Sequence, residues 1–89
     1  GKHLSLFIDA LYHNPEMEIE HNNIRYMING YIDGFDYILK VDTIEKNSKN
    51  IFLSSNPNRE ICVKQFEEAK IFLGKTIYEA EAEITVLYG

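Results

Sequence analysis

Two short turn signals constrain the fold of this chain more than any other feature, because both must agree on which side of a sheet is buried. Asn22-Asn23 can close a tight hairpin, since asparagine tolerates positive φ. Asp33-Gly34 is a second strong two-residue hairpin signal. The residues around both turns alternate between apolar and polar, as "EMEIEH" does, which is typical of half-buried strands.

The turn at Asn22-Asn23 sets the register of the first hairpin. It predicts these cross-strand pairs: His21 with Ile24, Glu20 with Arg25, and Ile19 with Tyr26. Apolar side chains then meet each other and a carboxylate meets a guanidinium. Such pairs contribute roughly 0.2–1 kcal/mol each and support this register.

The turn at Asp33-Gly34 sets the second hairpin. It predicts these pairs: Ile32 with Phe35, Gly30 with Tyr37, Ile28 with Leu39, and Tyr26 with Val41. Because strand side chains alternate, the two turns place the same five residues on one buried face: Ile19, Tyr26, Ile28, Leu39 and Val41. We therefore expect an antiparallel meander with strands near 16–21, 24–33 and 35–45.

Helical signals flank this meander. A stripe of apolar residues predicts a helix over 3–13, which Asn14-Pro15 ends. "NSKN" predicts a turn and "IFLS" a short fourth strand. Asn56 as N-cap and Pro57 as first helical residue predict a second helix to about Lys70. Its expected inward residues are Cys62, Phe66 and Ala69, with Ile61 at the edge.

The segment after Gly74 is expected to form a short acidic helix over 76–83, and "EITVLY" a possible C-terminal strand. The fold class is therefore α+β: an N-terminal helix, a three- to four-stranded antiparallel meander, a helix, a short acidic helix and a possible last strand. A chain of 89 residues makes this one domain, residues 1–89, with one sheet face packed by the first two helices.

Charge and cysteine usage narrow the function classes. The net charge is −5, from 14 acidic and 9 basic residues without a basic stripe, so direct nucleic-acid binding is not expected. An acidic balance instead favours a basic partner. Cys62 is the single cysteine, which indicates a reducing, cytoplasmic setting. No signal peptide is visible, and no apolar run approaches the roughly 20 residues of a membrane span.

The stretch "FLGKTIYE" contains Gly74-Lys75-Thr76, the last three residues of a phosphate-binding loop. The first glycine of that motif would have to stand at position 69, which is Ala69, and the segment before it is predicted to be helical. Thr76 and Glu79 match a capping box instead, in which each side chain bonds the other's amide. The motif therefore predicts a helix start and no nucleotide site.

No catalytic constellation can be assembled from the other reactive residues. His3, His13 and His21 lack metal-ligand spacing and are expected to be solvated. Cys62 stands among glutamates, which disfavour a thiolate, and is interpreted as a small buried residue. The glutamates at 16, 18 and 20 are interpreted as a solvated sheet face. We expect no catalytic residue, no cofactor and no metal, and hence no enzyme.

The outward face of the meander is the candidate contact surface. Met27, Tyr31 and Ile38 are predicted to point away from the core, among charged residues such as Arg25 and Lys40. An apolar spot with a charged rim is typical of a protein interface. A second helix covering this face would explain the same residues, and this alternative stays open.

The chain resembles a loose class of small uncharacterised proteins from Gram-positive bacteria and their phages. The resemblance lies in the order of its segments: a helix, then "EMEIEHNNIRYMI", "GYIDGFDYILKV" and "AKIFLGKTIYEAEAEITVLYG". The resemblance is one of pattern, implies an α+β fold and a mobile-element origin, and brings no catalytic residues.

Three functions are considered for this chain. The first is a non-catalytic protein-interaction module, such as an inhibitor or accessory factor, able to self-associate. The second is a small-molecule-binding or enzymatic domain with a pocket between sheet and helix, and the third is an acidic nucleic-acid mimic.

Overall fold

The computed structural model describes residues 7–88, and for Tyr88 the backbone only. It has the expected α+β fold. One antiparallel sheet has the strand order β4-β3-β2-β1-β5. The strands are β1 Glu16–His21, β2 Ile24–Asp33, β3 Asp36–Thr43, β4 Asn50–Asn56 and β5 Ile84–Tyr88. Helical residues 7–10 precede β1, the helix α2 (Arg59–Glu68) follows β4, and the 3-10 helix η1 (Glu81–Glu83) precedes β5.

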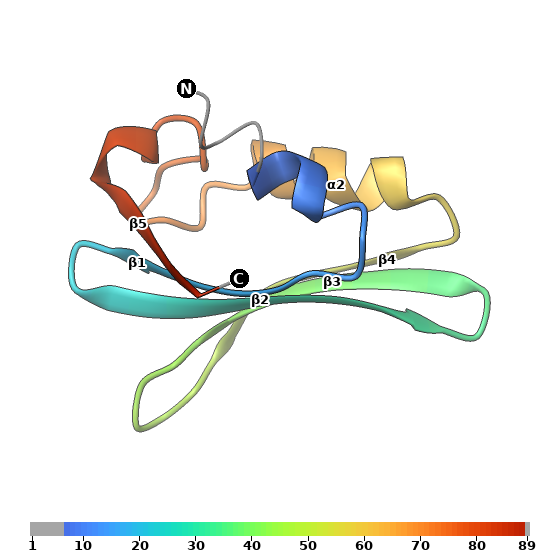
Figure 1. The fold of residues 1–89 in the computed structure, drawn as a ribbon, viewed down its shortest axis with the longest axis horizontal. Helices are drawn as coiled ribbons and strands as arrows, with labels where there is room; N and C mark the ends of the chain where they lie inside the picture. Colours follow the sequence, from blue (N-terminus) through green and yellow to red (C-terminus); the bar gives the residue numbers. More distant parts are fainter. Residues whose placement is uncertain (1–6, 89) are drawn as a thin grey trace.

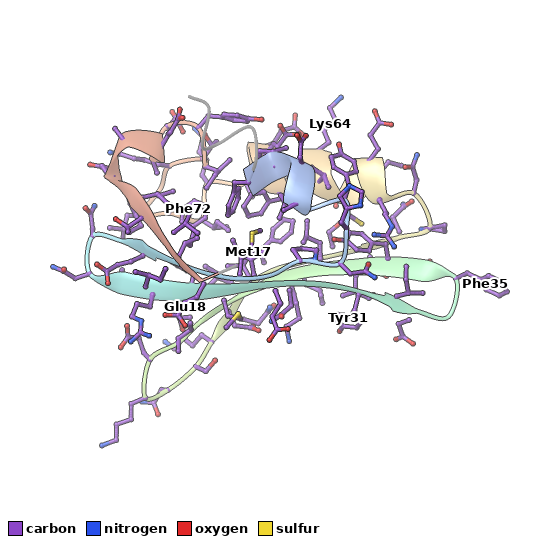
Figure 2. The ribbon with its side chains drawn as sticks, in the orientation of Figure 1. Met17, Glu18, Tyr31, Phe35, Lys64 and Phe72 are labelled. Carbon is purple, nitrogen blue, oxygen red and sulfur yellow. The ribbon has the colours of Figure 1, made fainter. Side chains whose placement is uncertain are left out.

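Every helical segment of the described chain lies on the same side of the sheet (Figure 1). We call the covered side the inner face and the other side the outer face. Figure 2 shows Met17 of β1 pointing toward the helices, whereas Glu18, the next residue, points away from them. No helix within residues 7–88 is long and apolar enough to cross a membrane.

The first hairpin has the predicted register. His21 pairs with Ile24, Glu20 with Arg25, and Ile19 with Tyr26. Asn22 and Asn23 both have positive φ, 50° and 68°, as a type I′ turn requires. The twist of such a turn matches the twist of the two strands, which explains why this short dipeptide sets the pairing.

The second hairpin turns one residue later than predicted. The loop is Gly34-Phe35, so Asp33 pairs with Asp36 and Ile28 pairs with Val41. The predicted partners of the β2 residues are therefore wrong by two positions. Gly34 has φ +64° and stands at the first central position, where glycine is preferred in a type II′ turn.

The prediction of the buried face is confirmed despite this shift. A change of two residues restores the alternation of side chains, so every inward residue stays inward. The sheet contributes seven buried apolar residues: Met17, Ile19, Tyr26, Ile28, Tyr37, Leu39 and Val41. The covering layer contributes eight: Phe7, Leu11, Cys62, Val63, Phe66, Phe72, Ile77 and Ala80.

The second helix starts later than predicted. Its N-cap is Asn58, whose side-chain oxygen accepts the N–H of Glu60 at 2.9 Å. Asn56 still ends β4, and its side chain accepts the N–H of Asn58 at 2.8 Å. Asn56 thus forms a turn ahead of the helix and does not cap it, because the chain must first leave the sheet. The inward residues Cys62 and Phe66 are confirmed, Val63 joins them, and Ala69 is the C-cap.

Tyr37 connects the sheet to both helical segments. Its hydroxyl donates a hydrogen bond to the carbonyl of Leu11, where the first helical segment ends. The guanidinium of Arg59 lies 4.5 Å from the centre of its ring. The helix predicted to reach residue 13 ends at residue 10, and a turn bonded three residues back continues to His13 before Asn14, which has φ 50°. Residues 3–6 of the predicted first helix lie outside the described residues.

Candidate interaction surface

The outer face carries no helical segment in the described part of the chain, so the alternative of a covering helix is excluded for residues 7–88 (Figure 1). Figure 2 shows Tyr31 pointing from this face away from the helices. Its side chain is 44% exposed, whereas Tyr26, five residues earlier on the same strand, is buried. The alternation of β2 therefore divides its tyrosines between core and surface.

Two of the three predicted contact residues lie together. Tyr31 of β2 and Ile38 of β3 are direct cross-strand partners. Met27 is half-buried and stands four residues from Tyr31 along β2, opposite Asp42. The pair Asn29 and Lys40 separates it from the other two. The structure therefore brings together Tyr31 and Ile38 and leaves Met27 apart.

Two exposed apolar residues were not predicted as part of this surface. Leu53 of β4 is 62% exposed and pairs with Lys40. Lys40 stands two residues after Ile38 on β3, so all three side chains share the outer face. Phe35 in the β2–β3 turn is 96% exposed. We call Tyr31, Ile38 and Leu53 the outer patch. Alternation alone does not find Leu53, because the β3–β4 register shifts beside Val41 and Asp42.

Charged side chains lie along the outer face. Six outward carboxylates lie on β1, β2 and β3: Glu16, Glu18, Glu20, Asp33, Asp36 and Asp42. The outward cations of these strands are Arg25 and Lys40. The β3–β4 loop carries Lys46 and Lys49, but it joins the sheet at the opposite end, beside Arg25. Asp33 and Asp36 therefore make the end beside Tyr31 and Ile38 acidic, whereas Glu18, Glu20 and Asp42 lie toward Arg25.

Both outward cations are bound within this face. Arg25 donates to Glu18 through Nε at 3.0 Å and through Nη2. This hydrogen bond and the charge of Glu18 raise the pKa of Arg25. Lys40 Nζ lies 3.2 Å from Asp42 Oδ2. Exposed pairs of this kind add little stability, about 0–1 kcal/mol, but they leave the face with a surplus of negative charge.

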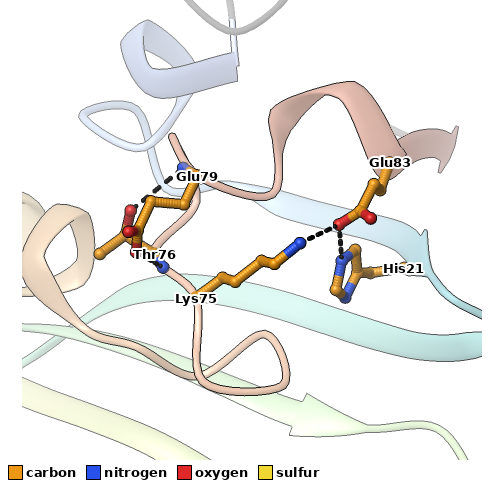
Figure 3. Close-up of polar contacts among 5 residues, drawn as sticks. All are labelled: His21, Lys75, Thr76, Glu79 and Glu83. Carbon is orange, nitrogen blue, oxygen red and sulfur yellow. Dashed lines mark hydrogen bonds and ion pairs between the residues drawn. The ribbon is translucent and has the colours of Figure 1, made fainter.

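A second polar cluster joins β1 to the segment before β5 (Figure 3). His21 Nε2 and Lys75 Nζ each lie 2.9 Å from the same oxygen, Oε1 of Glu83. The expectation of a solvated His21 is wrong, because His21 is fully buried. It shares the inner face with Ile19, and its ring meets Phe72 edge-on at 6.0 Å. His13 is exposed, and His3 lies outside the described residues.

The geometry of this cluster assigns its hydrogen-bond donors. An ionised carboxylate can only accept, so Nε2 of His21 and Nζ of Lys75 both donate to Glu83. Nδ1 is buried and has no hydrogen-bond partner among the described residues. The hydrogen bonds from His21 and Lys75 lower the pKa of Glu83. The cluster holds the segment before β5 against β1.

The capping reading of Gly74-Lys75-Thr76 is confirmed. Thr76 N–H donates to Glu79 Oε1 at 2.9 Å, and Glu79 N–H donates to Thr76 Oγ1 at 3.2 Å (Figure 3). The capped element is shorter than the predicted helix over 76–83, since a turn at 77–80 leads into η1. Leu73 and Gly74 form a tight turn, with φ 54° and 81°, between the bridged residues Phe72 and Lys75.

The other candidate chemistry is also placed. Cys62 is buried, and its Sγ donates to the carbonyl of Tyr37 at 3.5 Å. Within residues 7–88, no group of three His, Cys, Asp or Glu side chains is arranged to hold a metal ion.

Comparison of the chain with protein-family models, with curated proteins and with solved structures returned no match.

Proposed function

We propose that this domain is a non-catalytic protein-interaction module that binds a basic protein partner through the outer patch. The observation that carries this proposal is Tyr31, which is 44% exposed on the uncovered face and pairs across the strands with the half-buried Ile38. An inhibitor or accessory factor of phage or prophage origin, acting in the cytoplasm, fits the proposal and the resemblance of the sequence.

Two physical properties of the outer patch support this proposal. Apolar side chains at the centre and charged ones at the rim are the usual arrangement of a protein interface. Tyr31 has an apolar ring and a hydroxyl, and tyrosine is among the residues that contribute most to binding. The sheet also holds the patch on a rigid backbone, so little conformational entropy is lost on contact.

The acidic rim supports a basic partner. Negative charge around an interface speeds the encounter with a positively charged protein and repels other acidic surfaces. A protein that normally binds DNA or RNA belongs to this class of partner, because its contact surface is basic. In that case the domain would compete with nucleic acid for the same surface.

The proposal is tested by comparing two variants in affinity capture from a Gram-positive bacterial lysate, with and without nuclease. Tyr31→Ala removes the exposed tyrosine of the outer patch. Ile61→Ala removes a similarly exposed residue, 41% against 44%, from α2 on the covered side. We expect a nuclease-resistant partner bound by the wild type and by Ile61→Ala but not by Tyr31→Ala.

Folding must be measured alongside capture. Tyr31→Ala is expected to keep its free energy of unfolding within about 0.5 kcal/mol of the wild type, as exposed substitutions do. Capture that is equal for both variants would refute the outer patch as the contact surface. Unfolding of Tyr31→Ala would also refute it, because the residue would then support the core.

A further inference from the structure

Phe35 is the most exposed large apolar residue of the described chain, at 96% of its free surface. It lies at the far tip of the β2–β3 hairpin (Figure 2). The two apolar residues before Asp33, the last residue of β2, are exposed as well, Tyr31 at 44% and Ile32 at 53%. An aromatic side chain buries about 150–250 Å² when it finds a partner, so Phe35 leaves a large binding contribution unused in the isolated domain.

The fold itself does not call for phenylalanine here. Phe35 is the second central residue of the turn. The positive φ of the turn, +64°, is at Gly34, the first central residue, so the turn does not depend on the side chain at position 35. The flanking residues Asp33 and Asp36 are direct cross-strand partners. Like charges in that position disfavour a hairpin. Asp36 receives a hydrogen bond from the neutral hydroxyl of Ser55 at 3.1 Å, which leaves its charge in place.

The tip is held rigidly although it projects from the body. The β2–β3 ladder extends to its last pair, Asp33 with Asp36. Tyr37, two residues after Phe35, is buried, and its hydroxyl donates a hydrogen bond to the carbonyl of Leu11. An exposed aromatic on a rigid support loses little entropy on binding, which is the property of an interface anchor.

We propose that Phe35 is the anchor that enters an apolar pocket with a basic rim on the partner protein. This inference rests on the proposed function and names the recognition element and the chemistry of the partner's site. Asp33 and Asp36 would meet the cations of that rim, which removes the repulsion between them. Tyr31 follows on the outer face two residues before Asp33, so the tip and the outer patch can engage one continuous surface.

Charge selects this occupant over others. A second copy of the domain, docked tip to tip, would bring two pairs of Asp33 and Asp36 together. An anionic membrane and a nucleic acid would repel the same carboxylates. A cationic protein surface gains from both the aromatic ring and the charges.

The first test is crosslinking with a photoreactive residue. A variant that carries p-benzoylphenylalanine in place of Phe35 is added to the Gram-positive lysate and irradiated. The matched control carries the same residue in place of Ile61 on α2. The crosslinked peptide is then identified by mass spectrometry. We expect a crosslink at position 35, absent at position 61, to an apolar segment of a protein with lysine or arginine beside it. A crosslink to a second copy of this chain or to lipid would overturn the proposal.

The second test uses the partner protein that the crosslink identifies, purified without the crosslink, and measures its affinity for four variants of the domain. Phe35→Ala should weaken binding at least about tenfold and Phe35→Leu less, while the melting temperature stays that of the wild type. Asp33→Asn should slow association and reduce its salt dependence. If Phe35→Ala binds normally and Tyr31→Ala does not, the anchor is refuted and the proposed function stands. If neither variant loses affinity, both are refuted.

Discussion

The ring of Tyr37 passes directly over the backbone of Gly30. A Cβ atom at position 30 would overlap the Tyr37 hydroxyl and would lie 2.8 Å from Cζ of that ring. It would also lie 2.6 Å from Cδ of Pro15, whose carbonyl accepts the N–H of Gly30 at 2.9 Å. The absence of a side chain at Gly30 thus lets Tyr37 reach Leu11 and connect the sheet to the first helical segment.

Gly30→Ala should therefore destabilise the domain strongly. Both neighbours of the added methyl group are buried and cannot move aside, so we expect a loss of at least about 3 kcal/mol, the upper range for overpacking. Gly34→Ala is the control, since its Cβ would meet nothing within 4 Å and only its φ of +64° is unfavourable. That change should cost about 1–2 kcal/mol. Urea unfolding measures both, and equal losses would contradict the close contact.

Tyr37→Phe should change the alkaline stability. Burial raises the pKa of Tyr37 from 10.0 to about 12, against the opposing charge of Arg59. The unfolded chain therefore ionises this tyrosine first, so its contribution is complete below pH 10 and is lost as the pH rises from about 10 to about 12. At pH 7, Tyr37→Phe should cost about 1 kcal/mol for the lost hydrogen bond.

The difference between wild type and Tyr37→Phe should then shrink toward pH 12, because phenylalanine has no proton to lose. Urea unfolding at several pH values between about 9 and about 12 gives the two curves. A gap that stays constant over this range would mean that Tyr37 ionises equally in the folded and unfolded chains.

Glu83→Gln should flatten the acid side of the stability profile. Hydrogen bonds from His21 and Lys75 lower the pKa of Glu83 from its usual 4.5. Because the pKa of Glu83 is lower in the folded chain, ionised Glu83 stabilises the fold above the unfolded-state pKa of about 4.5. This stabilisation is lost as the pH falls through the folded-state pKa. The wild type should exceed the variant at pH 7, and the two should converge in acid. Lys75→Met, which removes one of the two donors, should give an intermediate profile.

Two leucines on adjacent strands test the faces of the sheet. Leu39 of β3 is fully buried, whereas Leu53 of β4 is 62% exposed on the outer face. Leu39→Ala should cost about 2–5 kcal/mol, as large-to-small changes in a core do. Leu53→Ala should cost less than about 0.5 kcal/mol. The free energies of unfolding decide this, and a large loss for Leu53→Ala would show that the outer face is covered.

The first hairpin could be predicted to the residue because Asn22 and Asn23 both accept positive φ and allow one turn geometry. The second could not, because Gly34 can occupy either central position of a tight turn. "DG" and "GF" are equally compatible with the alternating strands. Only the twist of the folded hairpin selects Gly34 as the first central residue. The buried face was predictable even so, since alternation is unchanged by a shift of two.

The surroundings of His21 and Leu53 could not be predicted for a different reason. His21 meets Glu83, a residue brought close only when β5 pairs with β1. The register of β4 changes at an irregularity beside Val41 and Asp42, which alternation does not reveal. The surroundings of His21 and the register of β4 both depend on how the strands pair in the complete sheet. Tyr31 and Ile38, within one hairpin, were predictable from local pattern alone.

The pairing of β5 with β1 has a consequence for how the chain folds as it is made. The ribosome releases residues 16–21 early, but their neighbours in the sheet, residues 84–88, emerge much later. Until then β1 is an unpaired edge, and His21 is without the carboxylate of Glu83. The meander and α2 can assemble first, since their contacts are local or nearly so. A nascent chain halted before Ile84 would therefore present an open β1 edge to other chains or to proteases, and the finished domain would not.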